Sequence, residues 1–486
     1  MARVRNATLC QHGVCLLGVM RALVLALYLH ERCEACSAMS VDEPLWRALS
    51  GATTVYIPRN HQPDWYWQEV WKKRGVRPTS GYEDVWLDRL YGEAQAQILG
   101  CWVHGGRYWE LMVNITKLFH MTTASSKPKF LRRLSSLSGQ EDDLDAESLP
   151  DMRLSICAPQ ECEADSMPKI FERTYAQKFM GRRPSLRIGN GSFSDVLHVE
   201  ELADWSSLNV DFVIAGVDGC GTSSLHRNLN EHPEITFSSW AEDFFFTEQL
   251  AHRLLPLKSQ VDGYNAQLKA IADERSQRFG MRPRLIGTCN PTIFSYALAR
   301  RKFASMPNLK MIVILCEPLG RMEKLFMEYH FCTQGKAPPC FRSASALLKE
   351  RHRKLRRFWR SRAIAEHMPS MMSLFSGRIL FVHQEQLRSH AQETYLSLVN
   401  FLGARYSFPQ KTMFLRYNSV GGHRTDLCAN QSLVSLLKRH LEPEYLMQEN
   451  LMRAAEEVVP ERLRRRLTRC DFAQDATKCP GRTACT

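Results

Sequence analysis

The chain has 486 residues, more than a single hydrophobic core usually organises, so its length predicts two domains. Lysine and arginine number 64 against 51 acidic residues, and the resulting net charge of +13 favours anionic partners. Nucleic acid is the competing class of partner, and it is disfavoured because the sequence contains no recognised DNA- or RNA-binding motif.

The first 38 residues have the pattern of a secretory signal. Basic residues accompany an apolar stretch over 14–29, and Cys36-Ser37-Ala38 provide the small residues of a cleavage site. Arg21 interrupts the apolar stretch and weakens a transmembrane interpretation, although a signal anchor stays open as the alternative. No other segment is apolar over the length that a bilayer requires. We therefore expect a protein of the secretory pathway, either secreted or anchored by its N-terminus.

The following part of the chain predicts a separate N-terminal domain. Tryptophans crowd residues 39–120, which indicates a folded unit. Residues 121–150 are serine-rich and charged, and we expect a disordered insertion there. Order returns over 151–205, which continues the domain and links it to the rest of the chain. Its fold stays open between an α-rich and a mixed architecture.

The segment Asp211–Leu225 carries the strongest chemical signal. An apolar run predicts a buried strand, a glycine-rich turn follows, and hydroxyl residues then open a helix. Backbone N–H groups in such a turn converge on one point, where the helix dipole adds positive charge. The predicted phosphate-binding residues are Asp218, Gly219, Cys220, Gly221, Thr222, Ser223 and Ser224. Taken alone, such a turn is also compatible with an ordinary strand-to-helix connection.

The spacing Gly216-x4-Gly221 is that of a nucleotide-binding P-loop, but Thr222 stands where a nucleoside-triphosphate enzyme has lysine. The sequence also lacks a convincing acidic strand end for Mg²⁺, which disfavours a kinase or nucleoside triphosphatase. We expect the loop to hold a phosphate group without lysine or a metal.

Three further motifs follow the loop in chain order. His232-Pro233-Glu234-Ile235 starts a short strand, and the next segment, 240–246, places Glu242 and Asp243 beside three phenylalanines. A third strand over 309–315 continues into a helix. Strands at Phe212, Ile235, Ile312 and Ile379 thus alternate with helices, a pattern that predicts an α/β fold with a parallel sheet.

These motifs, in this order, resemble those of the sulfotransferases that use 3′-phosphoadenosine 5′-phosphosulfate (PAPS), particularly the Golgi carbohydrate sulfotransferases. The resemblance covers about residues 210–451 and implies a sulfotransferase-like domain over 206–455, with a P-loop-type parallel sheet flanked by helices. It implies that the loop binds the 5′-phosphosulfate and that Glu242 is the general base. For the 3′-phosphate and adenine it implies Glu317, Arg321, Lys324, Gly421, Gly422 and His423.

The same resemblance implies the reaction and its setting. PAPS would be the co-substrate with no metal, and the location would be the Golgi lumen. The acceptor would be a hydroxyl group, in the first place on an anionic glycan, while a glycolipid, a tyrosine or a small alcohol stays open. A carboxylate beside phenylalanines is expected to be partly desolvated, which raises its pKa toward the working pH of a general base.

The sequence departs from the family pattern at residues that carry charge. The family's loop lysine aligns with Gly219, the lysine before the base with Ala241, and the first arginine of the 3′-phosphate element with Cys316. Lys324 stands in place of a serine and offers a compensating charge one turn beyond Arg321. An inactive protein that binds a nucleotide or a glycan is therefore the alternative function.

Sixteen cysteines favour an oxidising compartment and disulfides. Clustered candidates are Cys157 with Cys162, Cys332 with Cys340, and Cys470 with Cys479 or Cys485. We expect Cys220, Cys289 and Cys316 to be free or buried instead, because they fall in core and loop motifs. Zinc is disfavoured, since no pair of C-x-x-C elements has finger spacing.

Glycosylation sequons occur at Asn114, Asn190 and Asn430. The basic run over 349–362 has helical character and either faces an anionic acceptor or forms a solvated helix face, which is the commoner case. Residues 456–486 form a basic, cysteine-containing tail.

Overall fold

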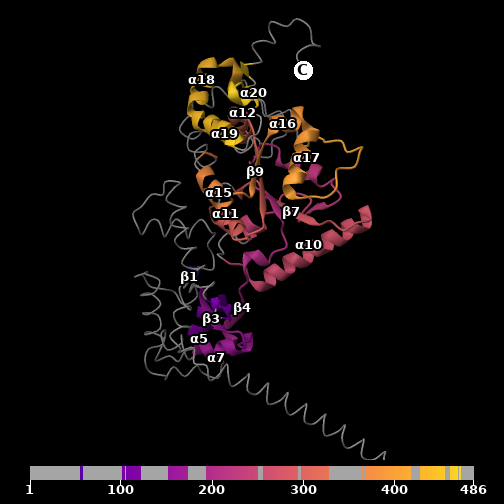
Figure 1. Ribbon diagram of the computed structural model, residues 1–486. Coiled ribbons are helices and arrows are strands. Elements are labelled where there is room, and N and C mark those ends of the chain that lie inside the picture. The colour runs from indigo at the N-terminus through magenta and orange to yellow at the C-terminus, as the bar shows by residue number, and fades with distance from the viewer. Residues whose placement is uncertain are drawn as a thin grey trace, which may run out of the picture. The chain divides into compact units, whose positions relative to one another are not determined.

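The computed structural model of the chain describes two compact units (Figure 1). The first takes the described residues up to Ala203 together with Leu257–Ser259, and the second takes the others. The described residues are 55–57, 101–103, 105–121, 151–172, 193–249, 255–293, 297–327, 364–365, 367–417, 427–454, 460–468 and 470–471. The signal segment, nearly all of the 121–150 insertion, the basic run and most of the C-terminal tail lie outside them.

The first unit contains an antiparallel sheet of order β1-β3-β2-β4. Its strands are β1 (Val55–Ile57), β2 (Gly106–Val113), β3 (Asp151–Pro159) and β4 (Leu197–Glu201). The helices α5 (Ile115–Met121) and α7 (Met167–Phe171) and the 3₁₀ turns η2 (Ala164–Ser166) and η4 (Phe193–Asp195) accompany it. Leu111, Ile156 and Phe171 are fully buried in this unit. The N-terminal domain is thus mixed in architecture.

The disulfides of the first unit differ from the predicted pairing. Cys157 bonds to Cys101 and not to its sequence neighbour Cys162, which is itself disulfide-bonded. Cys157 lies within β3, paired with Tyr108 of β2, and Cys101 lies just ahead of β2. Sheet pairing therefore brings Cys101 to Cys157, whereas Cys162 follows the turn after the strand.

The second unit contains a five-stranded parallel sheet of order β6-β7-β5-β8-β9. The strands are β5 (Phe212–Ile214), β6 (Ile235–Phe237), β7 (Leu285–Cys289), β8 (Lys310–Leu315) and β9 (Ile379–His383). The predicted parallel sheet and its four predicted strands are confirmed, and β5 lies at the centre. Because β5 and nearly all of β8 are buried, both faces of the sheet are covered.

Strand β7 was not predicted, because Gly287 interrupts its apolar pattern. A Cβ atom at position 287 would lie 2.2 Å from the ring atom Cζ of Phe212. The ring of Phe212 thus packs against the backbone of its neighbour strand, where only glycine fits.

Helices flank the sheet, and in Figure 1 α11 and α15 lie on one side of β9 while α16 and α17 lie on the other. The helices are α9 (Thr222–Leu229), α10 (Lys258–Phe279), α11 (Ala297–Ala304), α12 (Pro318–Met327), α15 (Met368–Leu374), α16 (Gln384–Ser389), α17 (Ala391–Leu402), α18 (Gln431–His440), α19 (Glu442–Ala454) and α20 (Glu461–Arg464). Short turns are η5 (Trp205–Ser207), the π-helical η6 (Phe245–Gln249) and η9 (Leu427–Ala429). Within the described ranges, no helix has both the length and the apolar character that crossing a membrane requires.

Candidate functional site

The glycine-rich loop, residues 216–221, joins the central strand β5 to helix α9 at the carboxyl edge of the sheet. Gly219 and Gly221 have φ angles of 79° and 107°, which side-chain-bearing residues rarely adopt. A Cβ at Gly219 would also lie 3.3 Å from Leu325, and one at Gly221 would lie 3.3 Å from Nε2 of Gln384. The loop therefore needs glycine at both positions, for its conformation and for its close packing.

The loop presents unused hydrogen-bond donors. Among the described residues, the backbone N–H groups of Gly219, Gly221, Thr222 and Ser223 have no acceptor. Thr222 is only 4% exposed, and its hydroxyl has no partner in the described part of the chain. Converging amides at the start of a helix attract an anion. This cradle of donors is chemically suited to a phosphate or sulfate group, the role predicted for this loop.

Ser224, also predicted to bind the cofactor, already has a partner within the chain. Its hydroxyl donates to the carbonyl oxygen of Tyr417 over 3.1 Å and accepts from the N–H of the same residue over 3.0 Å. Ser224 thus fixes the segment before residue 418 against α9. Gly421, Gly422 and His423, predicted to close over the nucleotide, lie outside the described residues.

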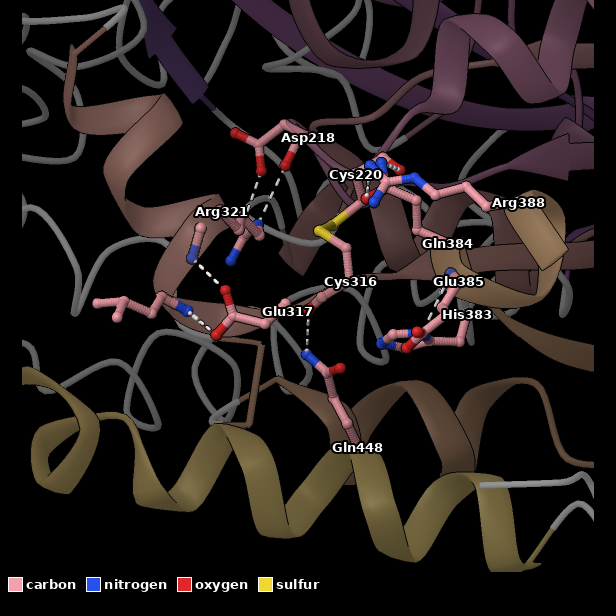
Figure 2. The surroundings of a disulfide bond; sticks show 12 residues. Asp218, Cys220, Cys316, Glu317, Arg321, His383, Gln384, Glu385, Arg388 and Gln448 are labelled. Carbon is pink, nitrogen blue, oxygen red and sulfur yellow. Dashed lines mark hydrogen bonds and ion pairs between the residues drawn. A yellow bond between two sulfur atoms is a disulfide. The ribbon is translucent and has the colours of Figure 1, made fainter. Parts of the chain in front are cut away.

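The one arginine that the family pattern retains is paired with the loop itself. Nη2 of Arg321 lies 2.6 Å from Oδ1 of Asp218, and Nε donates to the carbonyl oxygen of the same residue over 3.0 Å. Arg321 is 3% exposed, and a charge at such a depth requires a partner. The loop and α12 are therefore joined by a neutral ion pair (Figure 2).

A second carboxylate occupies the start of α12. Glu317 accepts hydrogen bonds from the N–H groups of Leu319 and Gly320, over 2.9 and 2.6 Å, and from the hydroxyl of Tyr445. Burial raises the pKa of Glu317, and these three hydrogen bonds oppose the rise. The first amides of this helix are thus already bound to an anion of the chain.

A disulfide between Cys220 and Cys316 links the loop to the end of β8, contrary to the expectation that both cysteines are unbridged (Figure 2). The two residues are 96 positions apart, but β5 and β8 are neighbours, with Ile214 opposite Ile312. Both chains leave the sheet at the same edge, so their next residues meet. Cys289 is free and buried, as predicted.

Gln384 adds a tie to the loop that was not predicted. It follows β9 and donates from Nε2 to the carbonyl oxygen of Cys220 over 2.7 Å. Its position immediately after a buried strand was the available signal, because the carboxyl ends of parallel strands meet at one edge. The loop is therefore held from both β8 and β9.

The predicted base, Glu242, lies after β6 and is exposed. Its expected desolvation is wrong, because Phe245 and Phe246 turn into the core, where Phe246 packs on Trp205 and Phe303. Burial raises the pKa of Cys289, and the charge of Glu242 raises it further. The carboxylate of Glu242 therefore lies near Cys289, at the end of β7.

Asp243, the neighbouring carboxylate, holds this segment in place. It accepts from the hydroxyls of Ser238 and Tyr264, while its N–H donates to the carbonyl oxygen of Cys289 over 2.8 Å. Asn290 joins the segment to β5, because its side chain donates to the carbonyl oxygen of Asp243 and its N–H donates to that of Ile214. Glu242 is thus carried on a hydrogen-bonded turn after β6, and β7 separates that strand from β5, which leads into the loop.

The two basic residues of α9 have local partners. Burial lowers the pKa of His226 to about 4, and its Nε2 contacts the carbonyl oxygen of Ser239 at 3.1 Å, so the ring is neutral near pH 7. Arg227 lies over the ring of Tyr417 at 4.7 Å. Lys324 is half-buried and has no carboxylate partner among the described residues.

Comparison with known proteins finds similarity to sulfotransferases. No family model matches the chain. Over 145 residues it is 26% identical to the membrane-associated sulfotransferase kil1 of Dictyostelium discoideum, an alignment that covers 29% of this chain and 27% of that protein. The chain is a divergent relative of the sulfotransferases. The match thus spans about a quarter of the curated relative's length.

Solved sulfotransferase structures are also similar at low scores. The sulfotransferase of Alicyclobacillus acidocaldarius is 17% identical, with a TM-score of 0.35 over 52% of this chain and 97% of that one. The sulfotransferase domain of the Synechococcus PCC 7002 olefin synthase is 14% identical, with a TM-score of 0.26 over 41% of this chain and 74% of that domain. The sequence match, not these structures, supports the relationship to sulfotransferases.

A sulfotransferase requires a sulfonate donor such as PAPS, and among the described residues those of the loop suit one end of it. The open amides of the loop and the hydroxyl of Thr222 suit its 5′-phosphosulfate end. The N–H groups and the guanidinium at the start of α12 do not suit its 3′-phosphate, because carboxylates of Glu317 and Asp218 already hold them, whereas Lys324 further along the helix has no carboxylate partner among the described residues. The roles predicted for Glu317, Arg321 and Lys324 in nucleotide binding stay predictions.

Proposed function

We propose that this chain transfers a sulfonate group from PAPS to a hydroxyl group of a carbohydrate acceptor in the secretory pathway. The observation that carries the proposal is the loop after β5, with four open backbone donors in a chain related to sulfotransferases. A carboxylate on a rigid turn after β6 stands at the same edge of the sheet.

The loop has the task of binding and orienting the donor. The N–H groups of Gly219, Gly221, Thr222 and Ser223 would hold the phosphosulfate, whose S–O bond is the one that breaks. Hydrogen-bond donors fixed in advance stabilise the charge that develops on the departing phosphate oxygen, because they need no reorganisation. The ties from Arg321, Cys316 and Gln384 keep these donors in position.

Glu242 would accept the proton of the acceptor hydroxyl. As the acceptor oxygen forms its bond to sulfur, its proton passes to this carboxylate, and the electron pair of the broken S–O bond stays with the phosphate. Exposure makes the carboxylate accessible to an acceptor larger than the site. The segment's hydrogen bonds through Asp243 fix where that carboxylate stands.

The acceptor class rests on charge and context. A net charge of +13 favours an anionic glycan over a neutral one. The cysteine content and the N-terminal segment favour the Golgi lumen, with the protein either secreted or anchored at the membrane.

Labelled PAPS incubated with a panel of sulfated and unsulfated glycans tests this function. We expect label transfer to at least one glycan, a loss of about 100-fold or more in Glu242→Gln, and unchanged turnover in Glu393→Gln, an exposed control on α17. The product 3′-phosphoadenosine 5′-phosphate should bind both variants, whereas ATP should not compete. Full turnover in Glu242→Gln would assign the base elsewhere, and nucleotide binding without any transfer would leave a binding protein.

A further inference from the structure

Among the described residues, the carboxyl edge of the sheet holds two sets of anion-binding donors besides the side chain of Lys324, and one of these two sets is open. The first set is the backbone N–H groups of the loop, which have no acceptor among the described residues. The second set is on α12, where two amides and the guanidinium of Arg321 are bound to carboxylates of the chain. A ligand with one phosphate finds donors in the loop, whereas a second phosphate must compete with the chain itself.

Glu317 acts as a built-in anion at α12. Its two oxygens take the N–H groups of Leu319 and Gly320, and Tyr445 of α19 donates to it as well. A ligand phosphate at this place would have to displace the carboxylate from all three donors and leave it buried without them. That exchange returns little binding energy, because one charge-assisted set of bonds replaces another.

Arg321 is likewise bound to a carboxylate of the chain. Two of its nitrogens bind Asp218, which belongs to the phosphate loop, so the pair brings no net positive charge to the site. The disulfide between Cys220 and Cys316 holds the same two segments together (Figure 2). The ion pair therefore cannot open simply by moving the loop away from α12.

We infer that this is a single-phosphate site, which binds a nucleoside 5′-phosphosulfate through its 5′ group and gains no affinity from a 3′-phosphate. This inference rests on the proposed function, and it defines the donor class as nucleoside 5′-phosphosulfates with or without a 3′-phosphate. Asp218 and Glu317 are the residues that set this preference.

Calorimetric titration of the full chain with three nucleotides tests the inference. We expect adenosine 5′-monophosphate and 3′-phosphoadenosine 5′-phosphate to bind with dissociation constants within about threefold of each other, and adenosine 3′-monophosphate to bind at least about tenfold more weakly. Binding of the bisphosphate more than about 20-fold tighter than the 5′-monophosphate would overturn the inference and leave the proposed function standing. If none of the three binds, both are overturned.

Glu317→Gln provides a second measurement. Loss of the charge and of one acceptor oxygen should free the N–H of Gly320. The affinity for the bisphosphate should therefore increase about fivefold relative to the affinity for the 5′-monophosphate. Glu393→Gln should leave the ratio unchanged, since this residue is exposed on α17. An unchanged ratio in a folded Glu317→Gln protein would overturn the part assigned to Glu317, and the wild-type titration decides the inference if that variant does not fold.

Discussion

Arg321 and Asp218, 103 residues apart, form a buried ion pair that joins helix α12 to the phosphate loop. The carboxylate therefore stands in the loop that presents the open backbone amides. Its charge opposes any anion that binds there, and the guanidinium cancels that opposition.

Asp218→Asn should consequently bind nucleotides more tightly. The substitution removes a negative charge beside the cradle and leaves Arg321 with a neutral partner, so we expect a gain of about fivefold in affinity for 3′-phosphoadenosine 5′-phosphate at low salt. The same change should lower the free energy of unfolding by about 3 kcal/mol, because it breaks a buried pair. Titration calorimetry and urea denaturation measure the two effects. Glu274→Gln, an exposed change on α10, is the control and should alter neither.

Removing the disulfide of the loop should affect stability and binding together. In the double variant Cys220→Ser and Cys316→Ser, we expect a loss of about 2–4 kcal/mol in unfolding free energy and weaker nucleotide binding, because a tie on the cradle is lost. The variant Cys428→Ser with Cys470→Ser removes the bridge between η9 and the segment after α20. That control should lose stability and keep nucleotide affinity. Equal affinities in the two double variants would contradict a positioning role for the first bridge.

A lysine at position 219, where the family pattern has one, should destabilise the loop, because any side chain at this position is unfavourable. Gly219 has a φ of 79° and its Cβ would lie 3.3 Å from Leu325, so Gly219→Ala should already cost about 1–2 kcal/mol of stability. Gly280 has a φ of 70° and open space around its Cβ position, so Gly280→Ala isolates the backbone cost. The urea midpoints of both variants separate the two contributions. An equal loss at the two positions would show that Leu325 yields to the new side chain.

Stability should fall between pH 6.5 and 4. Burial lowers the pKa of both His226 and His383 to about 4, from an ordinary value of 6.5. The unfolded chain therefore binds more protons in this window, so the histidines' contribution is present above pH 6.5 and is lost as pH falls toward 4. We expect each to account for about 2 kcal/mol between pH 7 and 5. Urea denaturation at both pH values measures this loss.

The variant His226→Gln keeps a donor for the carbonyl oxygen of Ser239 and cannot take up a proton. It should show about half of the wild-type loss between pH 7 and 5. His198→Asn, at an exposed position of β4, is the control and should behave like the wild type. Identical pH profiles for all three proteins would contradict the buried, neutral state of His226.

The sequence predicted those features that depend on residues close together in the chain. The apolar runs and the spacing of Gly216, Gly219 and Gly221 predicted the central strand, the loop and the helix after it, since backbone conformation depends on near neighbours. The same reasoning missed β7. Gly287 interrupts the apolar pattern of that strand, and it is required because the ring of Phe212, from another strand, packs against its backbone.

The segment after β6 illustrates a second limit. Its composition predicted a carboxylate among phenylalanines, but composition does not tell which of two adjacent side chains turns inward. Asp243 is buried in a network with Ser238 and Tyr264, while Glu242 is exposed. The environment of the proposed base therefore depends on the packing of α10 against this segment.

The sequence by itself determined the parallel α/β sheet, the glycine-rich loop and the likeness to sulfotransferases, because each depends on short stretches of the chain. Only the tertiary structure decided what the loop contacts. Strand order places β5 beside β8, so Cys220 bonds to Cys316 and Asp218 pairs with Arg321 across about 100 residues of chain. Contacts between strand ends depend on which strands are neighbours, and that order follows from the packing of the whole sheet.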